Sequence, residues 1–312
     1  MTNIEMRAAF GKELVNQMAI KEKIVVVNAD LSGACGTASI AAAYPKRSFN
    51  VGVQEANMAS FAAGLASYGF IPFIATFATF ATRRMCDQLT ISIAYAGNNV
   101  KVVGTDPGVG AELNGGTHMA LEDVGIVRSI PNILIVEPCD VRQLVGLLPQ
   151  IVDYPGPVYL RLLRKLTPDI FEEGRTFDLL TADRLRDGDD VTLICSGVEV
   201  HEALQAAGAL ANRGVEADVI NVHTIKPLDE ATILESVRRT GCVVTCENHN
   251  VIGGLGSAVA ELTAEKAPVP VLRVGVRDRF GEVGKLPDLK VAFGMTAATI
   301  VAKALELVGR KQ

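Results

Sequence analysis

Glu55 is the residue of this sequence that is best placed for acid–base chemistry. It stands where a predicted strand passes into a predicted helix, and the residues that follow it, 56–66, are almost all small or apolar. One interpretation is a first-turn acid that is stabilised by the helix dipole. The other is a carboxylate held in an apolar pocket, where it exchanges a proton with a ligand. The neighbouring residues alone leave both interpretations open.

Aromatic residues gather after a later apolar run. Phe77 and Phe80, with Phe70 and Phe73, place four of the eleven Phe residues within 70–80. Such a cluster is typical of a hydrophobic core, but it also suits the wall of a pocket that binds a flat heterocycle.

A glycine-rich segment runs from residue 104 to His118. It holds five Gly in fifteen residues, whereas the average content of Gly is about 7%. Such a segment either lets the backbone approach a ligand closely or forms a flexible surface loop. His118 is expected to open a helix with Glu122 and Asp123 in its first turns, and a lone His is more often structural than functional.

The elements that must position these residues alternate between short apolar runs and longer helical patterns. The runs are rich in β-branched residues and do not alternate in polarity, so we expect a parallel sheet covered by helices on both faces. This alternation predicts an α/β fold, in which the residues that follow the strands meet at one edge. The predicted strands are 24–27, 73–75, 100–103, 133–136, 157–160, 191–194, 217–220, 243–244 and 269–272. The predicted helices are 55–67, 81–94, 141–152, 200–212, 230–239, 257–266 and 297–307.

A break in this pattern divides the 312 residues into two domains. Pro168, Gly174 and the charged run 186–190 interrupt the alternation. We predict an N-terminal domain over 1–167, a linker over 168–186 and a C-terminal domain over 187–312, and both domains have ordinary sizes.

Composition excludes several classes of protein. The net charge is -5 and there is no basic run, which argues against a nucleic-acid partner. Six scattered Cys without a CxxC pair predict reduced thiols and a cytoplasmic location. We expect no signal peptide and no membrane span. No dinucleotide or P-loop motif occurs, and the glycines at 253, 254 and 256 fit either a weak ligand signal or close helix packing.

In their order and spacing, several motifs resemble the transketolases over essentially the whole chain. The N-terminal part resembles their pyrimidine-binding domain and the rest their C-terminal domain. The resemblance implies two three-layer αβα domains with mainly parallel sheets. It rests on the motifs NVGVQE (50–55), ATFATF (75–80), GTH (116–118) with Glu122 and Asp123, RSIPN (128–132), VYLRLLR (158–164) and ENH (247–249).

One part of the transketolase pattern is missing. Transketolases bind thiamine diphosphate between two domains, one of which holds the diphosphate and Mg²⁺ with a Gly-Asp-Gly motif followed by an Asn. This sequence has no Gly-Asp-Gly, and the run 187–190 only looks similar. The resemblance therefore implies the C-terminal subunit of a split transketolase, active only with an N-terminal subunit that carries the diphosphate and Mg²⁺ site. It also implies a dimer of this chain within a heterotetramer.

The resemblance assigns roles around the cofactor. The carboxyl of Glu55 would bond a ring nitrogen of the aminopyrimidine and so promote removal of the thiazolium proton. Phe77 and Phe80 would pack on the pyrimidine, and Asp30 would lie near the cofactor. His118 would act beside the reacting carbons and bond hydroxyls of the substrate.

Departures from the family pattern concern the sugar substrate. Arg7 and Arg164 match phosphate-binding arginines, and a guanidinium suits phosphate or sulfonate. Asp106 replaces a His and Asn114 replaces an Asp, both at substrate-binding positions, while Ala34 replaces a Ser. We expect a two-carbon ketol unit to pass from a ketose to an aldose, with the identity of both sugars left open.

Two alternatives remain at this point. The β subunit of a thiamine-dependent 2-oxoacid dehydrogenase has the same two-domain plan, although the segments at Thr76-Phe77 and Thr117-His118 look more like transketolase. A non-catalytic structural paralogue is the other alternative, and the presence of Glu55 speaks against it.

Overall fold

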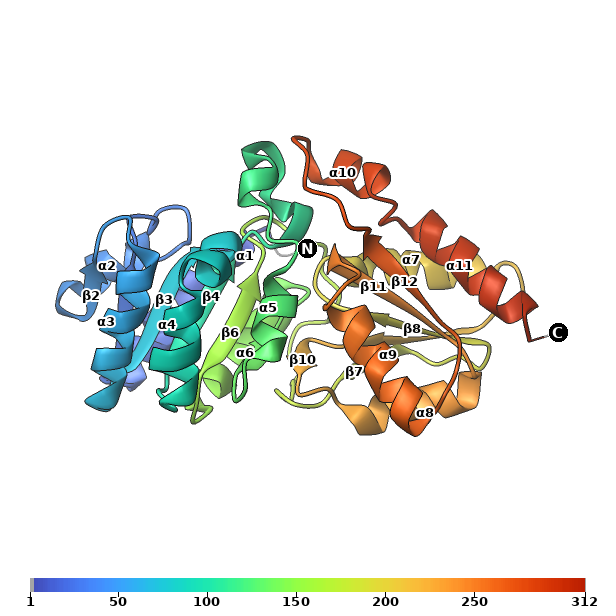
Figure 1. Cartoon of the computed structure of the whole chain (residues 1–312), viewed down its shortest axis with the longest axis horizontal. Helices are drawn as coiled ribbons and strands as arrows, with labels where there is room; N and C mark the ends of the chain where they lie inside the picture. The colour runs from blue at the N-terminus through green and yellow to red at the C-terminus, as the bar shows by residue number, and fades with distance from the viewer. Residues whose placement is uncertain (1–2, 312) are drawn as a thin grey trace.

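Two mainly parallel sheets form the framework of the protein in the computed structural model, which describes residues 3–311 (Figure 1). The N-terminal sheet has the strand order β10-β5-β6-β4-β3-β1-β2. Its strands are β1 (Ile24–Asn28), β2 (Ser48–Asn50), β3 (Ile71–Phe77), β4 (Lys101–Thr105), β5 (Leu134–Val136), β6 (Val158–Leu162) and β10 (Thr224–Lys226). One face packs against α1 (Met6–Ile20) and α6 (Val141–Asp153), and the other against α3 (Glu55–Ser67) and α5 (Asp123–Ser129).

The C-terminal sheet has the strand order β12-β11-β8-β9-β7. Its strands are β7 (Asp183–Arg186), β8 (Val191–Cys195), β9 (Ala217–Asn221), β11 (Val243–Asn250) and β12 (Val271–Val276). Helices α7 (Glu199–Ala211) and α11 (Ala297–Gly309) lie on one face, and α8 (Glu230–Thr240) and α9 (Leu255–Lys266) on the other. The short helices are α2 (Ala38–Ala43), α4 (Cys86–Gln88) and α10 (Leu286–Ala292). The predicted α/β fold with mainly parallel sheets is confirmed.

The predicted helices match the observed ones within a few residues, except at 81–94. There the chain forms two π-helical segments, Phe80–Arg84 and Leu89–Tyr95, on either side of α4. Such wider turns recur at functional sites, because they shift side chains away from the regular helical positions. Helix α1 was not predicted, since Gly11 and Gln17 on its buried side interrupt the apolar pattern.

In the C-terminal half of the chain, two short strands lie outside the predicted pattern. β7 pairs antiparallel with β9, so the end of the segment predicted as a linker, 168–186, is part of the C-terminal sheet. Earlier in that segment, the backbone N–H groups of Ile170 and Phe171 donate to Asp140 at 2.8 and 3.0 Å. β10 follows β9 in the chain, yet it pairs antiparallel with β5 of the N-terminal sheet. Each of these two strands has only three or four residues and lacks the apolar run that marks the predicted strands.

The segment Leu286–Gly309 has the length and composition of a membrane span, with a mean hydropathy of 1.6. In the structure it is divided into α10 and α11, and α11 packs on α7. Ile300, Ala304 and Leu307 on α11 are buried in the C-terminal core. A helix that packs in a core passes the same test of length and composition, so this segment is weak evidence for a membrane.

Arg161 joins the two domains and is almost fully buried, with 1% of its side chain exposed. Its Nε and Nη2 donate to the two carboxylate oxygens of Asp123 at 2.8 and 3.1 Å, and its Nη1 pairs with Glu137. In the C-terminal domain, the backbone oxygen of Asn248 accepts from Arg161 at 2.7 Å, and Ser196 donates to Glu137 at 2.7 Å. Burial alone would raise the pKa of Asp123, but Arg161 outweighs it and holds this pKa below the usual value.

We expect Arg161→Met to destabilise the protein by about 3–5 kcal/mol, because Asp123 and Glu137 would stay buried without their cation. Urea unfolding followed by circular dichroism measures this change. The matched control is Arg310→Met, which removes an exposed ion pair with Glu306 and should cost less than about 1 kcal/mol. Equal and small effects of both substitutions would contradict the view that Arg161 holds the domains together.

Candidate active site

The carboxyl ends of β1, β3 and β4 meet at one edge of the N-terminal sheet. The three strands are parallel neighbours, and Phe77 at the end of β3 is paired with Thr105 at the end of β4. Asp106 directly follows the end of β4, and Asp30 lies two residues after the end of β1. The edge that the sequence predicts as a site is therefore assembled from these three strands.

Glu55 begins α3 at this edge and is buried, with 3% exposure. The turn before it is fixed by Asn50, whose Oδ1 accepts from the backbone N–H groups of Asp30 at 3.0 Å and Gly52 at 3.1 Å. Gly52 has a φ of +77°, a conformation that favours glycine. On β3, Thr76 donates its hydroxyl to Glu55 Oε1 at 3.4 Å. Glu55 is therefore a buried carboxylate and not a solvated first-turn acid.

Three rings stand next to one another beside this carboxylate. The centroids of Phe77 and Phe80 are 5.8 Å apart, and His118 lies edge-on to both at 5.7 and 5.3 Å. The hydroxyl of Thr117 and Nδ1 of His118 are 2.9 Å apart. The structure thus brings together the aromatic cluster and the end of the glycine-rich segment, which are nearly forty residues apart in the chain.

Arg83 fastens the glycine-rich segment to the π-helical segment Phe80–Arg84, a role that sequence reasoning missed. Its guanidinium bonds the hydroxyl of Thr79 and donates to the backbone oxygen of Thr117 at 3.2 Å. Its Nε lies 2.9 Å from a carboxylate oxygen of Glu122. Arg83 therefore fixes the residue before His118.

Arg84 is the second arginine that sequence reasoning missed. Its Nη1 donates to both oxygens of Glu55, at 3.2 and 3.3 Å, and its guanidinium carbon lies 3.6 Å from the ring centre of Phe80. The only sequence signal for these roles is the pair of consecutive arginines that follows Phe80.

Asp106 and Arg164 form a close ion pair at the end of β4. The carboxylate of Asp106 accepts from the backbone N–H of Arg164 at 3.1 Å and pairs with its Nε and Nη2. Asp106 is 1% exposed, and burial raises its pKa against the opposing effect of Arg164. The guanidinium carbon of Arg164 lies 4.9 Å from the ring centre of Phe77. Asp106 therefore orients Arg164, and the hydrogen bonds that its carboxylate accepts come from that residue.

Arg7 lies beside the same pair, whereas Asn114 is placed further out along the loop. The backbone N–H of Arg7 donates to the backbone oxygen of Arg164 at 3.3 Å. The guanidinium of Arg7 pairs with Glu5 at 2.7 Å and donates to the backbone oxygen of Ala34 at 3.3 Å. Asn114 is exposed at the end of a 3₁₀ segment, Gly108–Asn114.

The glycine-rich segment is packed against the C-terminal domain and is not a free surface loop. Asn248 donates to the backbone oxygen of Pro107 at 3.0 Å and accepts from the N–H of Val109 at 2.9 Å. Gly108 has a φ of +57°, and a Cβ there would lie 2.2 Å from Asn248 Oδ1. His118 does not open a helix as predicted: it ends a 3₁₀ turn that starts at Gly116, and α5 begins at Asp123. Close approach of backbone to side chain thus explains the glycine at 108.

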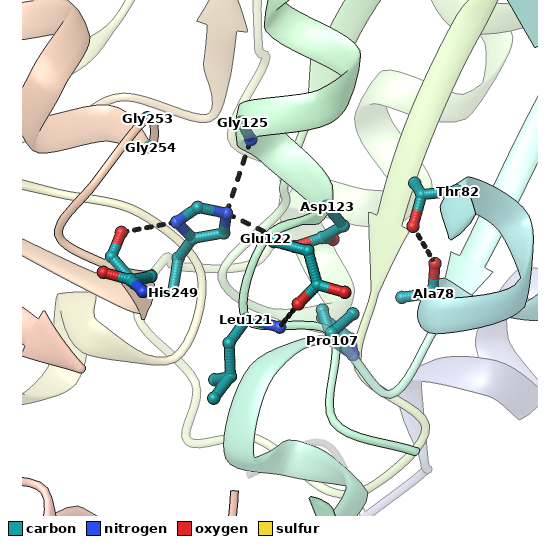
Figure 2. Close-up of polar contacts among 12 residues, drawn as sticks. Ala78, Thr82, Pro107, Leu121, Glu122, Asp123, Gly125, His249, Gly253 and Gly254 are labelled. Carbon is teal, nitrogen blue, oxygen red and sulfur yellow. Dashed lines mark hydrogen bonds and ion pairs between the residues drawn. The ribbon is translucent and has the colours of Figure 1, made fainter. Parts of the chain in front are cut away.

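His249 of the C-terminal domain also contacts the N-terminal domain, at α5 (Figure 2). Its Nδ1 is 2.6 Å from the backbone oxygen of Asn250, and its Nε2 accepts from the N–H of Gly125 at 3.4 Å. Burial lowers the pKa of His249 to about 4, so the ring is neutral at pH 7. It contributes packing and hydrogen bonds to the domain interface without adding a charge.

The glycines near residue 254 serve close packing. Glu247 accepts from the N–H groups of Leu255 and Gly256 at 2.7 and 3.0 Å, which caps the start of α9. A Cβ on Gly254 would lie 1.9 Å from Glu247 Oε2. Of the two interpretations of this motif, the structure supports helix packing.

The donor set at the sheet edge fits a flat, nitrogen-containing ring and not a metal–diphosphate group. A buried carboxylate faces a ring nitrogen well, and aromatic side chains suit the face of such a ring. Within residues 3–311, no group of three or more His, Cys, Asp or Glu side chains is arranged to hold a metal ion. The site can therefore hold and activate a heterocycle, while the rest of a larger cofactor needs other contacts.

Two family models match the chain. The transketolase pyrimidine binding domain matches residues 2–169, and the transketolase C-terminal domain matches residues 180–300. The chain belongs to the transketolase family. Membership of this family implies thiamine diphosphate as the cofactor.

Similar proteins show that this member of the transketolase family belongs to a split enzyme. The chain is 53% identical over 290 residues to a 6-deoxy-6-sulfo-D-fructose transketolase subunit of Clostridium sp. (strain MSTE9), covering 93% of this chain and 90% of that protein. It is 40% identical to a putative transketolase C-terminal section of Methanocaldococcus jannaschii, covering 96% and 95%. It is 35% identical to one subunit of an apulose-4-phosphate transketolase of Phocaeicola vulgatus, covering 98% of each protein. The chain is the C-terminal subunit of a split transketolase, which is a transferase. These relatives favour this assignment over the β subunit of a 2-oxoacid dehydrogenase.

Solved structures agree with this assignment. A split gene transketolase, described as an inactive beta4 tetramer, superimposes with a TM-score of 0.91 at 40% identity, over 99% of this chain and all of that one. A transketolase from Leishmania mexicana matches with a TM-score of 0.81 at 24% identity, over 98% of this chain and 46% of that one. The second comparison shows the fold alone, and it places this chain against about half of an undivided enzyme.

Proposed function

We propose that this chain supplies the pyrimidine half of a thiamine diphosphate site whose other half, with Mg²⁺, lies on a separate N-terminal subunit. The observation that carries the proposal is the buried carboxylate of Glu55 beside the rings of Phe77, Phe80 and His118. The absence of a Gly-Asp-Gly motif from the sequence supports a partner for the diphosphate and metal. A heterotetramer with two copies of each chain, located in the cytoplasm, is the assembly that we propose.

Each residue at the sheet edge has a separate role in this proposal. Glu55 would share a proton with a ring nitrogen of the aminopyrimidine, while Phe77 and Phe80 hold the ring in place. His118 would donate to hydroxyls of the sugar, and Asp30 would lie at the rim. When bound, thiamine diphosphate supplies the electron sink for breaking the carbon–carbon bond, and the protein supplies orientation and electrostatics.

The isolated chain is expected to have no transketolase activity and to bind thiamine diphosphate weakly, because it lacks the diphosphate and metal contacts. Calorimetry with cofactor and Mg²⁺ on the purified chain tests this, and addition of the N-terminal subunit is the control that should restore both properties. The inactive tetramer described for a split relative supports this expectation. Tight, Mg²⁺-dependent binding without a partner would overturn the divided site.

We expect Glu55→Gln to slow exchange of the thiazolium proton by about 100- to 10,000-fold in the reconstituted complex. The amide keeps the size of the side chain, but it cannot share a proton with the pyrimidine. The cofactor should still bind within a few fold, since its diphosphate is held elsewhere. Quenched NMR in heavy water measures the exchange. A rate within threefold of the wild type would show that Glu55 is only a first-turn acid, and the assignment of this sheet edge as the pyrimidine site would be wrong.

The charges near Arg164 support a ketose donor that ends in a sulfonate. Three cations at this place are each paired with an acid of the chain: Arg7 pairs with Glu5, Arg164 with Asp106, and Lys165 with Glu112. The charges of these three cations are therefore already balanced within the chain. A phosphate monoester carries about −1.5 to −2 at pH 7, whereas a sulfonate carries one charge and needs less compensation. The relative that is 53% identical acts on a 6-sulfo sugar, in agreement with this proposal.

Asp106→Asn is expected to reduce the preference for a sulfonate donor over the matching phosphate donor by about tenfold. Removing one negative charge near the terminal group helps a dianion more than a monoanion. The ratio of kcat/KM for 6-deoxy-6-sulfo-D-fructose and fructose 6-phosphate measures this preference. The control is Asp153→Asn, an exposed acid paired with Lys21. An unchanged ratio in Asp106→Asn would show that Asp106 does not set the preference.

A further inference from the structure

The place where the aminopyrimidine is expected contains a side chain of the protein itself. The guanidinium of Arg84 lies 3.6 Å above the centre of the Phe80 ring and donates to both oxygens of Glu55. We propose that Arg84 is an internal occupant of the pyrimidine site, which must leave before the cofactor's ring can bind. This inference rests on the proposed function of Glu55 and Phe80.

A guanidinium imitates the ring in the two features that the site recognises. It is flat, so it stacks on an aromatic face, and its N–H groups donate to a carboxylate. Both oxygens of Glu55 are already in contact with Arg84 Nη1, at 3.2 and 3.3 Å. The aminopyrimidine would need the same carboxylate and the same face of Phe80, so the two cannot bind at once.

Arg84 is free to move, in contrast to its neighbour. Its side chain is 49% exposed, and within residues 3–311 its guanidinium bonds and stacks with Glu55 and Phe80 alone. Arg83 is instead fixed by Thr79, Thr117 and Glu122. The guanidinium of Arg84 can therefore turn toward solvent or toward a subunit that covers the site, without breaking the wall of the pocket.

Proton sharing by Glu55 also depends on this movement. A hydrogen-bonded cation stabilises the ionised carboxylate, and it occupies the oxygens that would face the pyrimidine nitrogen. While Arg84 is in place, both oxygens of Glu55 are occupied and do not face a ligand. Arg84 thus keeps the site closed in the chain that has not yet bound its cofactor.

The proposal is tested by binding of the aminopyrimidine fragment of the cofactor, a hydroxymethyl aminopyrimidine, to the full isolated chain. Arg84→Ala and Arg84→Gln should each bind this probe at least about tenfold more tightly than the wild type in a calorimetric titration. Arg47→Gln is the matched control, because Arg47 also stacks on a ring, that of Tyr44 at 4.1 Å, away from the site. Circular dichroism confirms that each variant is folded.

The outcomes separate this inference from the proposed function. Equal or weaker binding by both Arg84 variants would overturn the role of Arg84 as an occupant. The double variant Glu55→Gln, Arg84→Ala should lose the gained affinity, because the carboxylate is needed. If the double variant binds as tightly as Arg84→Ala, the probe does not use Glu55, and the proposed pyrimidine site itself is wrong.

Discussion

The buried guanidinium of Arg161 is the contact on which the arrangement of the site depends. It is held by Asp123 and Glu137 in the N-terminal domain and donates to the backbone oxygen of Asn248 in the C-terminal domain. The side chain of the same Asn248 fixes Pro107 and Val109 at the start of the glycine-rich segment. The position of His118 at the far end of that segment is therefore set partly by the other domain.

This dependence explains why the candidate site in the N-terminal domain needs the C-terminal domain, although the rings of Phe77, Phe80 and His118 all belong to the N-terminal domain. Breaking a buried ion pair leaves a charge without compensation, which is far more costly than losing a surface pair. The neighbouring titratable groups limit that cost. Burial lowers the pKa of His249 to about 4 and raises the pKa of Glu247 to about 7, so near pH 7 the His249 ring is neutral and Glu247 carries only part of a negative charge.

Much of the fold and part of the site could be predicted from the sequence, because their signals are local in the chain. The helix that begins at Glu55 starts and ends where its pattern predicts, and the convergence of Phe77 and His118 follows from parallel strands that end at one edge. Contacts between distant segments left no such signal. The pairing of β10 with β5 joins strands that are far apart in the chain. The ion pair with Arg164 gives Asp106 a partner within the protein, whereas the sequence predicted that Asp106 binds substrate. Arg83 and Arg84 were missed because a π-helical segment turns adjacent residues toward different partners, which the helical period of a sequence does not show.

The site that results has a buried acid, a wall of rings and cations that are already paired within the chain. A catalytic site with uncompensated charges would attract anions without a partner, whereas here each nearby arginine is paired with a carboxylate of the chain. Binding a charged cofactor must therefore replace existing ion pairs, and the energy for this replacement has to come from contacts that this chain lacks. In the proposed split enzyme, the subunit that brings the diphosphate and metal contacts would also provide the free energy that opens the site. Catalysis would then be confined to the assembled complex, where a reactive cofactor would be shielded from water.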